Sequence, residues 1–450
     1  MIAPHDRPTM IAIARRDPIA TAAITALLGV GAIAWLMPPL IIPLLFALAL
    51  AVAATIAYAR PVAAMALWLI LVETTPEMWL SDLIGAHELI IALLKSAGLL
   101  IIALAALRTA PRADRFNPSY AFIVMFIDGA IHGLWPGLTP MASLRSLIGS
   151  AAPFAAGYLR LSPAMRATII RCTIIGPAIT VGFGIALAAP GIRPLYSTQL
   201  GAIRLAASSA PAFLGGFAMI AIFAGLLEYL RTGRPRNLAW IGLNYIILIA
   251  TGARSPLAMA GFITLATLMI TPSPFLTPAR RFAILALGSA SLGIVLMAAS
   301  ALRVIRVVDL INLGDAGSLS NRQLIWPFFE AAARQSPWLG WGVGAGKAVV
   351  SMKSHIGRLL GTNAAHNEYL RITVEGGVIG ALLLFAMLTL WLWRGSAALP
   401  TAQRRIIRLV FLAFAVQSCT DNTLIATTSL VFFTWARAVF VNPDESPPPA

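Results

Sequence analysis

The chain has 450 residues, of which 59% are hydrophobic and only 11% are charged, and its mean hydropathy is +0.84. Soluble domains carry about 25% charged residues, so the composition excludes an ordinary soluble protein and predicts an all-α polytopic membrane protein. The formal net charge is +16. Most of the excess is arginine at the ends of apolar runs, which is the topology signal of membrane proteins. No nucleic-acid-binding motif is present, so we expect no nucleic-acid partner.

Apolar runs long enough to be membrane helices recur along the chain, and each such helix needs about 20 apolar residues. The candidate runs are 19–37, 40–58, 62–72 (which could continue to 80), 89–107, 121–135, 147–159, 168–189, 212–230, 238–250, 257–270, 282–302, 378–393, 406–416 and 424–439. Several are short, so the pattern predicts about 12–14 transmembrane helices, the lower number including a re-entrant or interfacial pair. No small-residue cleavage site clearly follows the first run, which favours a retained helix over a signal peptide.

Arginine-rich and arginine-poor loops alternate along the chain, and basic loops stay on the cytoplasmic side of a membrane. The alternation places both termini in the cytoplasm and the long polar segment 303–363 outside, in the periplasm of a Gram-negative cell. We therefore expect four parts. They are an N-terminal transmembrane bundle (1–302), a periplasmic loop with catalytic elements (303–366), C-terminal transmembrane helices (367–440) and a disordered cytoplasmic tail (441–450).

Several arginines fall on the outer side, where topology does not explain them. Arg204 lies in a loop, Arg254 lies in a short turn between two apolar runs, and Arg322 lies in the long polar segment. The planar guanidinium forms paired, charge-assisted hydrogen bonds with phosphate, so these three side chains could hold a diphosphate. The alternative is that they snorkel to lipid headgroups or form local ion pairs. Arg254 fits that alternative least well, because its turn is short.

A stretch reading AAHNEYLRITVEGGVIG follows the long polar segment and enters a membrane run. His366 could act as a general base near neutral pH, or it could be an interfacial histidine bonded to a backbone carbonyl. If His366 begins a helix, Arg371 and Glu375 form an i, i+4 structural pair on a neighbouring face. Gly376 and Gly380 form a small-xxx-small pair, which permits close helix packing in a membrane.

The long polar segment itself contains two recognisable features. Residues 322–333 resemble a helix that Pro327 bends or restarts. A glycine-rich turn, GWGVGAGK, fails the nucleotide-binding pattern G-x-x-x-x-G-K-[ST], because Trp341 stands at the first glycine position and Ala348 replaces Ser or Thr. Trp338 and Trp341 could stack on sugar rings or anchor the segment at the membrane interface.

The sequence gives little indication of a metal-binding site or of a reactive cysteine. Cys172 and Cys419 lack metal-ligand spacing, and we interpret both as small buried hydrophobic residues. Paired carboxylates of the glycosidase type and clusters of metal ligands are not evident. We therefore expect no metal and no cofactor.

His366-Asn367, followed after nine residues by Gly377-x-x-Gly380, resembles the signature of the O-antigen ligase and Wzy-type polymerase superfamily. Other segments resemble it more loosely: Arg322 with Trp326 as an Arg-x-x-x-Trp segment, SPWLGWGVGAG as its glycine-rich turn, ARSP at 253–256 as its Ser-Arg turn with Ala253 in place of Ser, and Arg204 as an arginine before a helix.

The resemblance implies a metal-independent, inverting glycosyltransferase with a GT-C-like fold in the bacterial inner membrane. The donor would be a glycan on undecaprenyl diphosphate, and the acceptor a glycan or lipid A-core. By position, His366 would activate the acceptor hydroxyl, and Arg204, Arg254 and Arg322 would bind the diphosphate. Asn367, together with Trp338 and Trp341, could contact the glycan.

Three functions remain open at this point. A ligase and a polymerase of the same superfamily fit every residue named above and differ only in the acceptor. A flippase and a chain-length regulator as neighbouring partners would favour the polymerase. The third alternative is a transporter or flippase, which would need charged residues near the membrane midplane, where Lys95 and Asp128 are the main candidates.

Overall fold

The computed structural model describes residues 29, 51–84, 87–109, 111–199, 202–302 and 324–441. The first apolar run apart from residue 29, most of the second, the segment 303–323 with Arg322, and the tail 442–450 lie outside the described residues. The chain from Pro61 onward forms one structural unit, separate from Met1–Arg60. The description below concerns that second unit.

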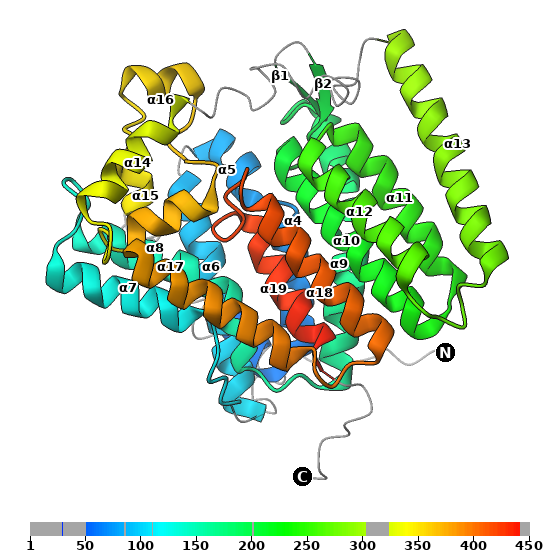
Figure 1. The fold of residues 1–450 in the computed structure, drawn as a ribbon, viewed down its shortest axis with the longest axis horizontal. Helices are drawn as coiled ribbons and strands as arrows, with labels where there is room; N and C mark the ends of the chain where they lie inside the picture. The colour runs from blue at the N-terminus through cyan, green and yellow to red at the C-terminus, as the bar shows by residue number, and fades with distance from the viewer. Residues whose placement is uncertain are drawn as a thin grey trace, which may run out of the picture. The chain divides into compact units, whose positions relative to one another are not determined.

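The second unit is built from helices, labelled as in Figure 1. In chain order they are α4 (Pro61–Glu73), α5 (Pro76–Ile84), α6 (His87–Thr109), α7 (Ser119–His132), α8 (Pro140–Ala151), the 3-10 helix η2 (Ala152–Tyr158), α9 (Pro163–Ala188), α10 (Pro211–Thr232), α11 (Pro235–Thr251), α12 (Arg254–Ile270), α13 (Pro278–Leu302), α14 (Trp326–Gln335), α15 (Ala345–Ala348), α16 (His355–Leu360), α17 (Glu368–Gly395), α18 (Thr401–Gln417) and α19 (Thr427–Val439). Each predicted apolar run from residue 62 onward coincides with a helix, and the run 147–159 is divided between α8 and η2.

Helices of membrane-spanning length and composition are present among the described residues. Four qualify, namely Ile90–Thr109, Pro163–Ala188, Pro211–Thr232 and Glu368–Gly395. Three shorter helices, α4, α7 and α12, are also apolar. The protein is therefore a helical membrane protein, as its composition indicates. The larger number of 12–14 spans stays a prediction.

The chain breaks after α4, so the run that begins at residue 62 ends near residue 72 and does not continue as one helix to residue 80. Thr75 adopts a left-handed backbone with φ 48°, and Pro76 then begins α5. A proline disfavours the helical conformation in the residue before it, and it is well tolerated in the first turn of a new helix. Two helices therefore replace one.

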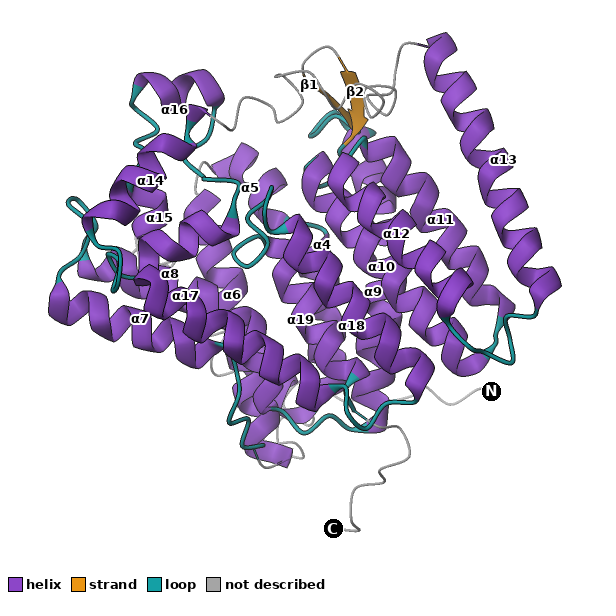
Figure 2. Ribbon diagram, in the orientation of Figure 1, coloured by secondary structure: helices purple, strands orange, loops and turns teal. Residues whose placement is uncertain are grey.

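Residues 190–210, expected only as a loop, contain the two strands drawn in Figure 2. β1 (Tyr196–Gln199) and β2 (Ala202–Leu205) pair antiparallel, with Ser197 opposite Arg204. The hairpin gives Arg204 a fixed direction, because side chains alternate between the two faces of a strand.

Helix α10 lies at the centre of the bundle and packs against α9, α11, α12, α18 and α19. Of the 18 consecutive residues that form the most apolar part of α10, 89% are buried. Gly225 lets α11 approach, since an added Cβ there would lie 2.7 Å from a side-chain carbon of Ile241. Such close contacts between small residues are how membrane helices associate.

The predicted Gly376–Gly380 pair does provide a close helix contact. An added Cβ at either position would lie within 3 Å of the Met125 side chain on α7. Gly377, between them, has a left-handed φ of 58°, which divides α17 at a kink. Helix α17 thus passes α7 at close range and changes direction there (Figure 1).

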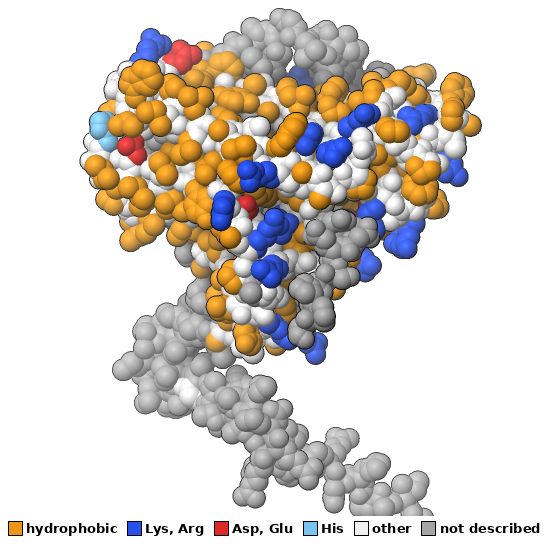
Figure 3. Space-filling model, turned by 60° about the horizontal axis from the view of Figure 1, so that its bottom comes forward, with side chains coloured by type: hydrophobic (Ala, Val, Ile, Leu, Met, Phe, Trp, Pro, Cys, Tyr) orange, Lys and Arg blue, Asp and Glu red, His pale blue; other side chains and the backbone are white. Residues whose placement is uncertain are grey.

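The bundle has two distinct ends. At the first, which we call the basic end, α10 and α17 finish and α11 and α18 begin. Lys and Arg side chains gather on the face shown in Figure 3, and the basic end carries Arg231, Arg234, Arg236, Arg394, Arg404, Arg405 and Arg408. The second, which we call the polar end, holds the β1–β2 hairpin, the α11–α12 turn, the residues before α17 and the α18–α19 connection.

Cys419 lies in the α18–α19 connection and is exposed, so its expected burial is wrong, whereas Cys172 is buried as expected.

Candidate active site

His366 lies just before α17 and not within it. The helix begins at Glu368, and His366 adopts a left-handed backbone with φ 47°. This conformation is uncommon for a residue with a side chain, and such strain gathers at functional sites. Two hydrogen bonds hold the segment: Trp326 Nε1 donates to the carbonyl of Ala365 at 2.9 Å, and Glu368 N donates to the carbonyl of Ser418 at 2.8 Å.

The imidazole of His366 faces an acid that the sequence analysis did not select. Its Nδ1 lies 3.7 Å from Asp421 Oδ1, and its Nε2 lies 3.4 Å from Thr362 Oγ1. The first distance is too long for a hydrogen bond, but it is short enough for attraction once the ring is protonated. Asp421 belongs to the α18–α19 connection, and only the fold brings it next to His366. In the sequence it is recognisable only as an acid in a loop that is predicted to lie on the outer side.

Asn367 has a local structural role. Its side-chain oxygen accepts a hydrogen bond from Leu370 N at 3.2 Å and so caps α17. Asparagine is among the best residues for this position. The cap fixes the start of the helix one residue after His366, while contact with a glycan stays a prediction.

Arg204 and Arg254 are both placed at the α11–α12 turn. Arg204 Nε donates to the carbonyl of Thr251, the last residue of α11, at 2.7 Å. After the left-handed Gly252, Arg254 begins α12 behind Ala253, a residue without a side-chain acceptor. The N-terminus of a helix favours anions. Two guanidinium groups and a helix N-terminus therefore gather positive potential here. Arg322, the third predicted member, lies outside the described residues.

The first turns of α10 lie between the α11–α12 turn, which carries Arg254, and the α18–α19 connection. An added Cβ on Gly215 would lie 2.5 Å from Ala253 Cβ, and one on Gly216 would lie 2.8 Å from Thr428 Cγ2 of α19. A pocket with an empty volume of about 340 Å³ opens on the same side, and it is lined by Gly216, Met219, Ile220, Phe414, Gln417, Asp421, Asn422, Thr423, Ala426, Thr428 and Phe432. Asp421 thus belongs both to this pocket and to the surroundings of His366.

A buried ion cluster supports the helix that follows His366. The predicted Arg371–Glu375 pair is present, with Nη1 2.7 Å from Oε2. Glu368, which sequence reasoning missed, accepts a second hydrogen bond from Arg371 Nε at 3.0 Å. All three side chains are at most 3% exposed. Lys347 lies close enough to interact electrostatically with Arg371 and Glu375 of this cluster.

The glycine-rich turn packs on the kink of α17. Trp341 N and Gly342 N donate to the carbonyls of Val374 and Glu375, each at 2.9 Å. These N–H groups are therefore engaged and cannot cradle a nucleotide phosphate. The indole of Trp341 is also engaged, because its Nε1 donates to the Ala332 carbonyl at 2.9 Å. Trp338 by contrast is 66% exposed.

The family comparison agrees with the resemblance found in the sequence. Residues 238–385 match the family model described as O-antigen ligase. The chain carries an O-antigen ligase domain. This domain includes Arg254, Trp338, Trp341, His366 and Asn367, whereas Arg204 and Asp421 lie outside the matched segment. None of the curated proteins matches the chain.

Proposed function

We propose that the protein is a membrane glycosyltransferase of the O-antigen ligase type. It moves a glycan from undecaprenyl diphosphate to an acceptor hydroxyl at the periplasmic face of the inner membrane, in the synthesis of lipopolysaccharide or exopolysaccharide. The observation that carries the proposal is the arrangement of the polar end. There a histidine facing an acid and two arginines at a helix N-terminus flank the first turns of α10, in a chain with an O-antigen ligase domain.

The proposed reaction is a single displacement at the anomeric carbon of the donor sugar. His366 takes the proton from the acceptor hydroxyl, whose oxygen then forms the new glycosidic bond. The bond between the anomeric carbon and the phosphate oxygen breaks, and its electron pair leaves with undecaprenyl diphosphate. Attack opposite the leaving group inverts the anomeric configuration, and the energy comes from the diphosphate linkage.

Electrostatic interactions would stabilise both the departing diphosphate and the protonated His366. The departing diphosphate carries negative charge, and Arg204, Arg254 and the N-terminus of α12 would stabilise it. Fixed charges aimed at a leaving group are commonly the largest contribution to catalysis. The Asp421 carboxylate, 3.7 Å from His366, would stabilise the imidazolium that forms when His366 accepts the proton. Arg322 stays a third proposed ligand of the diphosphate.

A direct test uses the purified full chain, a glycan on undecaprenyl diphosphate as donor, and two acceptors offered separately. Glycan transfer to lipid A-core supports the ligase. Transfer to a lipid-linked repeat unit supports the second candidate, a Wzy-type polymerase. Transfer to neither acceptor would contradict the proposed activity.

A deletion strain separates the same two functions in the cell. Loss of a ligase leaves long chains that are not joined to lipid A-core. Loss of a polymerase leaves a single repeat unit joined to it. Gel analysis of extracted surface polysaccharide distinguishes the two outcomes, and restoration by the intact gene is the control.

A further inference from the structure

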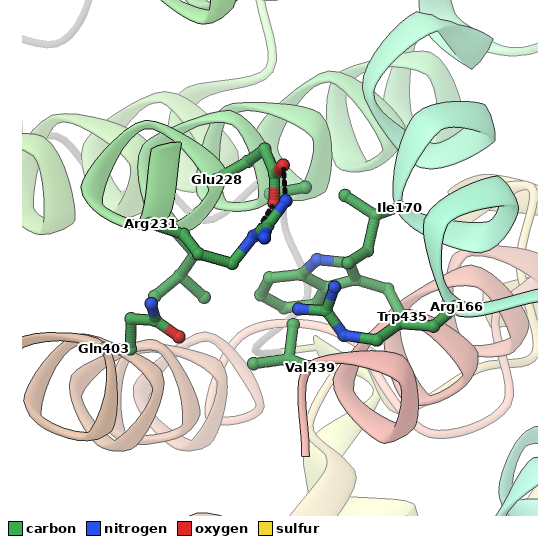
Figure 4. A pocket seen from close by; sticks show the side chains of 9 residues that line it. Arg166, Ile170, Glu228, Arg231, Gln403, Trp435 and Val439 are labelled. Carbon is green, nitrogen blue, oxygen red and sulfur yellow. Dashed lines mark hydrogen bonds and ion pairs between the residues drawn. The ribbon is translucent and has the colours of Figure 1, made fainter. Parts of the chain in front are cut away.

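A second polar pocket lies at the basic end, away from the candidate active site. It opens between α9, α10, α18 and α19 and has an empty volume of about 230 Å³. Figure 4 shows the side chains that line it, among them Arg166, Glu228, Arg231, Gln403 and Trp435. Apolar residues of α9, α10 and α19 complete the wall. The transfer reaction proposed above uses none of these groups.

This pocket contains hydrogen-bond donors that can bind an acceptor atom of a ligand. Trp435 is fully buried, and no acceptor among the described residues bonds its Nε1. A buried indole N–H normally has a partner, so this one indicates a ligand with an acceptor atom. Arg166 is 7% exposed, and its Nε donates to the carbonyl of Val441 at 3.2 Å, which fixes the guanidinium in the wall. The amide of Gln403 adds another donor.

The charge of the pocket is positive. Arg231 forms an ion pair with Glu228, with 2.5 Å between Nη2 and Oε1 (Figure 4). The second guanidinium, that of Arg166, is in excess over this single carboxylate. Ile170 and Leu227 supply an apolar wall beside the charges. A phosphate joined to a hydrocarbon group matches this combination.

The position of the pocket identifies the source of the phosphate. Arg166 lies in the first turn of α9 and Arg231 in the last turn of α10, and both helices are of membrane-spanning length. Such helix ends lie at the level of the lipid headgroups, where basic pockets between helices bind anionic lipids. We propose that this pocket binds the headgroup phosphate of an anionic membrane phospholipid, with the glycerol and first acyl carbons against the apolar wall.

Native mass spectrometry of the full chain in detergent tests this proposal, with phosphatidylglycerol and phosphatidylcholine as probes. The wild type should retain phosphatidylglycerol preferentially. Arg166→Gln should reduce its retention about fivefold, the effect of removing one basic contact with an anionic lipid. Trp435→Phe keeps an aromatic ring of smaller size and removes the indole N–H, and it should also reduce retention. Arg405→Gln is the matched control, because it removes an exposed charge from the same end, and it should leave retention unchanged.

Three results would overturn the proposal. Equal losses in Arg166→Gln and Arg405→Gln would show general electrostatic attraction in place of a site. Equal retention of the two lipids by the wild type would remove the selectivity for charge. Thermal stabilisation by inorganic phosphate alone, equal to that by phosphatidylglycerol, would show an anion site without a lipid. Because the readout is lipid retention, failure here leaves the proposed glycosyl transfer untouched.

Discussion

His366 occupies a strained position between a capped helix and a loop held by Trp326. We expect His366→Ala to lower glycan transfer by about a hundredfold or more, the usual contribution of a general base. Rates should be measured with purified protein at matched amounts. His355→Ala is the control, since His355 is an exposed histidine at the start of α16, and it should transfer normally. Wild-type rates in His366→Ala would leave the histidine a structural role only.

Asp421→Asn tests the acid that faces His366. The substitution preserves shape and removes the negative charge 3.7 Å from the imidazole. We expect the rate of transfer to fall, by less than in His366→Ala, with little change in the affinity for the donor. A fall in donor affinity with an unchanged maximal rate would instead place Asp421 in substrate binding.

Arg254 belongs to the proposed diphosphate site, and its loss should weaken donor binding. Charge-assisted hydrogen bonds contribute about 1.5–3 kcal/mol, so Arg254→Ala should lower the affinity for the lipid diphosphate about ten- to a hundredfold. Titration of the purified protein with the donor measures this affinity. Arg405→Ala, at the opposite end, should bind the donor as the wild type does. Unchanged affinity in Arg254→Ala would contradict the proposed site.

At the scale of elements, α17 depends on a glycine that no other residue replaces easily. Gly377 has φ 58°, and an added Cβ would lie 2.2 Å from the Trp338 carbonyl. Its ψ of −165° places it in a backbone region that essentially only glycine adopts. We expect Gly377→Ala to lower the unfolding free energy by about 1–3 kcal/mol or more, the cost of holding a side chain in such a conformation. Gly261→Ala in α12 is the control, because nothing lies within 4 Å of its added Cβ, and it should be neutral or slightly stabilising. Thermal unfolding in detergent compares the two variants, and equal midpoints would show that the kink tolerates a side chain.

The Glu368–Arg371–Glu375 cluster is a second feature at this scale. Arg371→Ala would leave two carboxylates buried without their cation, and we expect a loss of about 3–5 kcal/mol, typical of a broken buried ion pair. Arg334→Ala breaks an exposed pair with Glu330 and should change stability by less than about 1 kcal/mol. The same unfolding measurement compares them. Similar small losses in both variants would mean that the cluster is not truly buried in the membrane protein.

Sequence patterns located most elements and some local pairs, because these depend on short-range spacing. The i, i+4 pair of Arg371 with Glu375 and the packing of Gly376 and Gly380 follow directly from helix periodicity. Glu368 was missed because its role depends on where α17 begins, which the Asn367 cap decides. The hairpin that carries Arg204 was missed because its strands are short and flanked by turn residues.

At the scale of the whole molecule, long-range proximity was beyond the sequence. His366 and Asp421 are separated by the whole of α17 and α18, and no local pattern records that they face each other. The same holds for Arg204 and the turn at Thr251. Burial of a single residue is equally hard to predict, as Cys419 shows. Its apolar surroundings favoured the core, whereas the fold leaves it exposed.

The exposure of Cys419 also provides a test of membrane orientation. Cys419 lies two residues before Asp421 at the polar end, and the other cysteine, Cys172, is buried. If the polar end faces the periplasm, a membrane-impermeant maleimide should label the wild type in cells with a permeable outer membrane. Cys172→Ala should label equally and Cys419→Ala should not. Labelling that requires opening of the inner membrane would reverse the proposed orientation.

The contact between the glycine-rich turn and the α17 kink has a consequence for recombination between related proteins. Backbone hydrogen bonds join residues 337–342 to 374–379 in both directions, since Trp341 N donates to Val374 O and Val378 N donates to Pro337 O. Unpaired backbone groups are costly when buried, so neither segment is independent of the other. A foreign loop can form these bonds only with glycine at position 340, where an added Cβ would lie 2.5 Å from Gly377 N. A chimera with its crossover point beyond residue 379 should therefore be more stable than one with its crossover point before residue 374. The smallest exchangeable module of this domain is thus the loop together with the first half of the following helix.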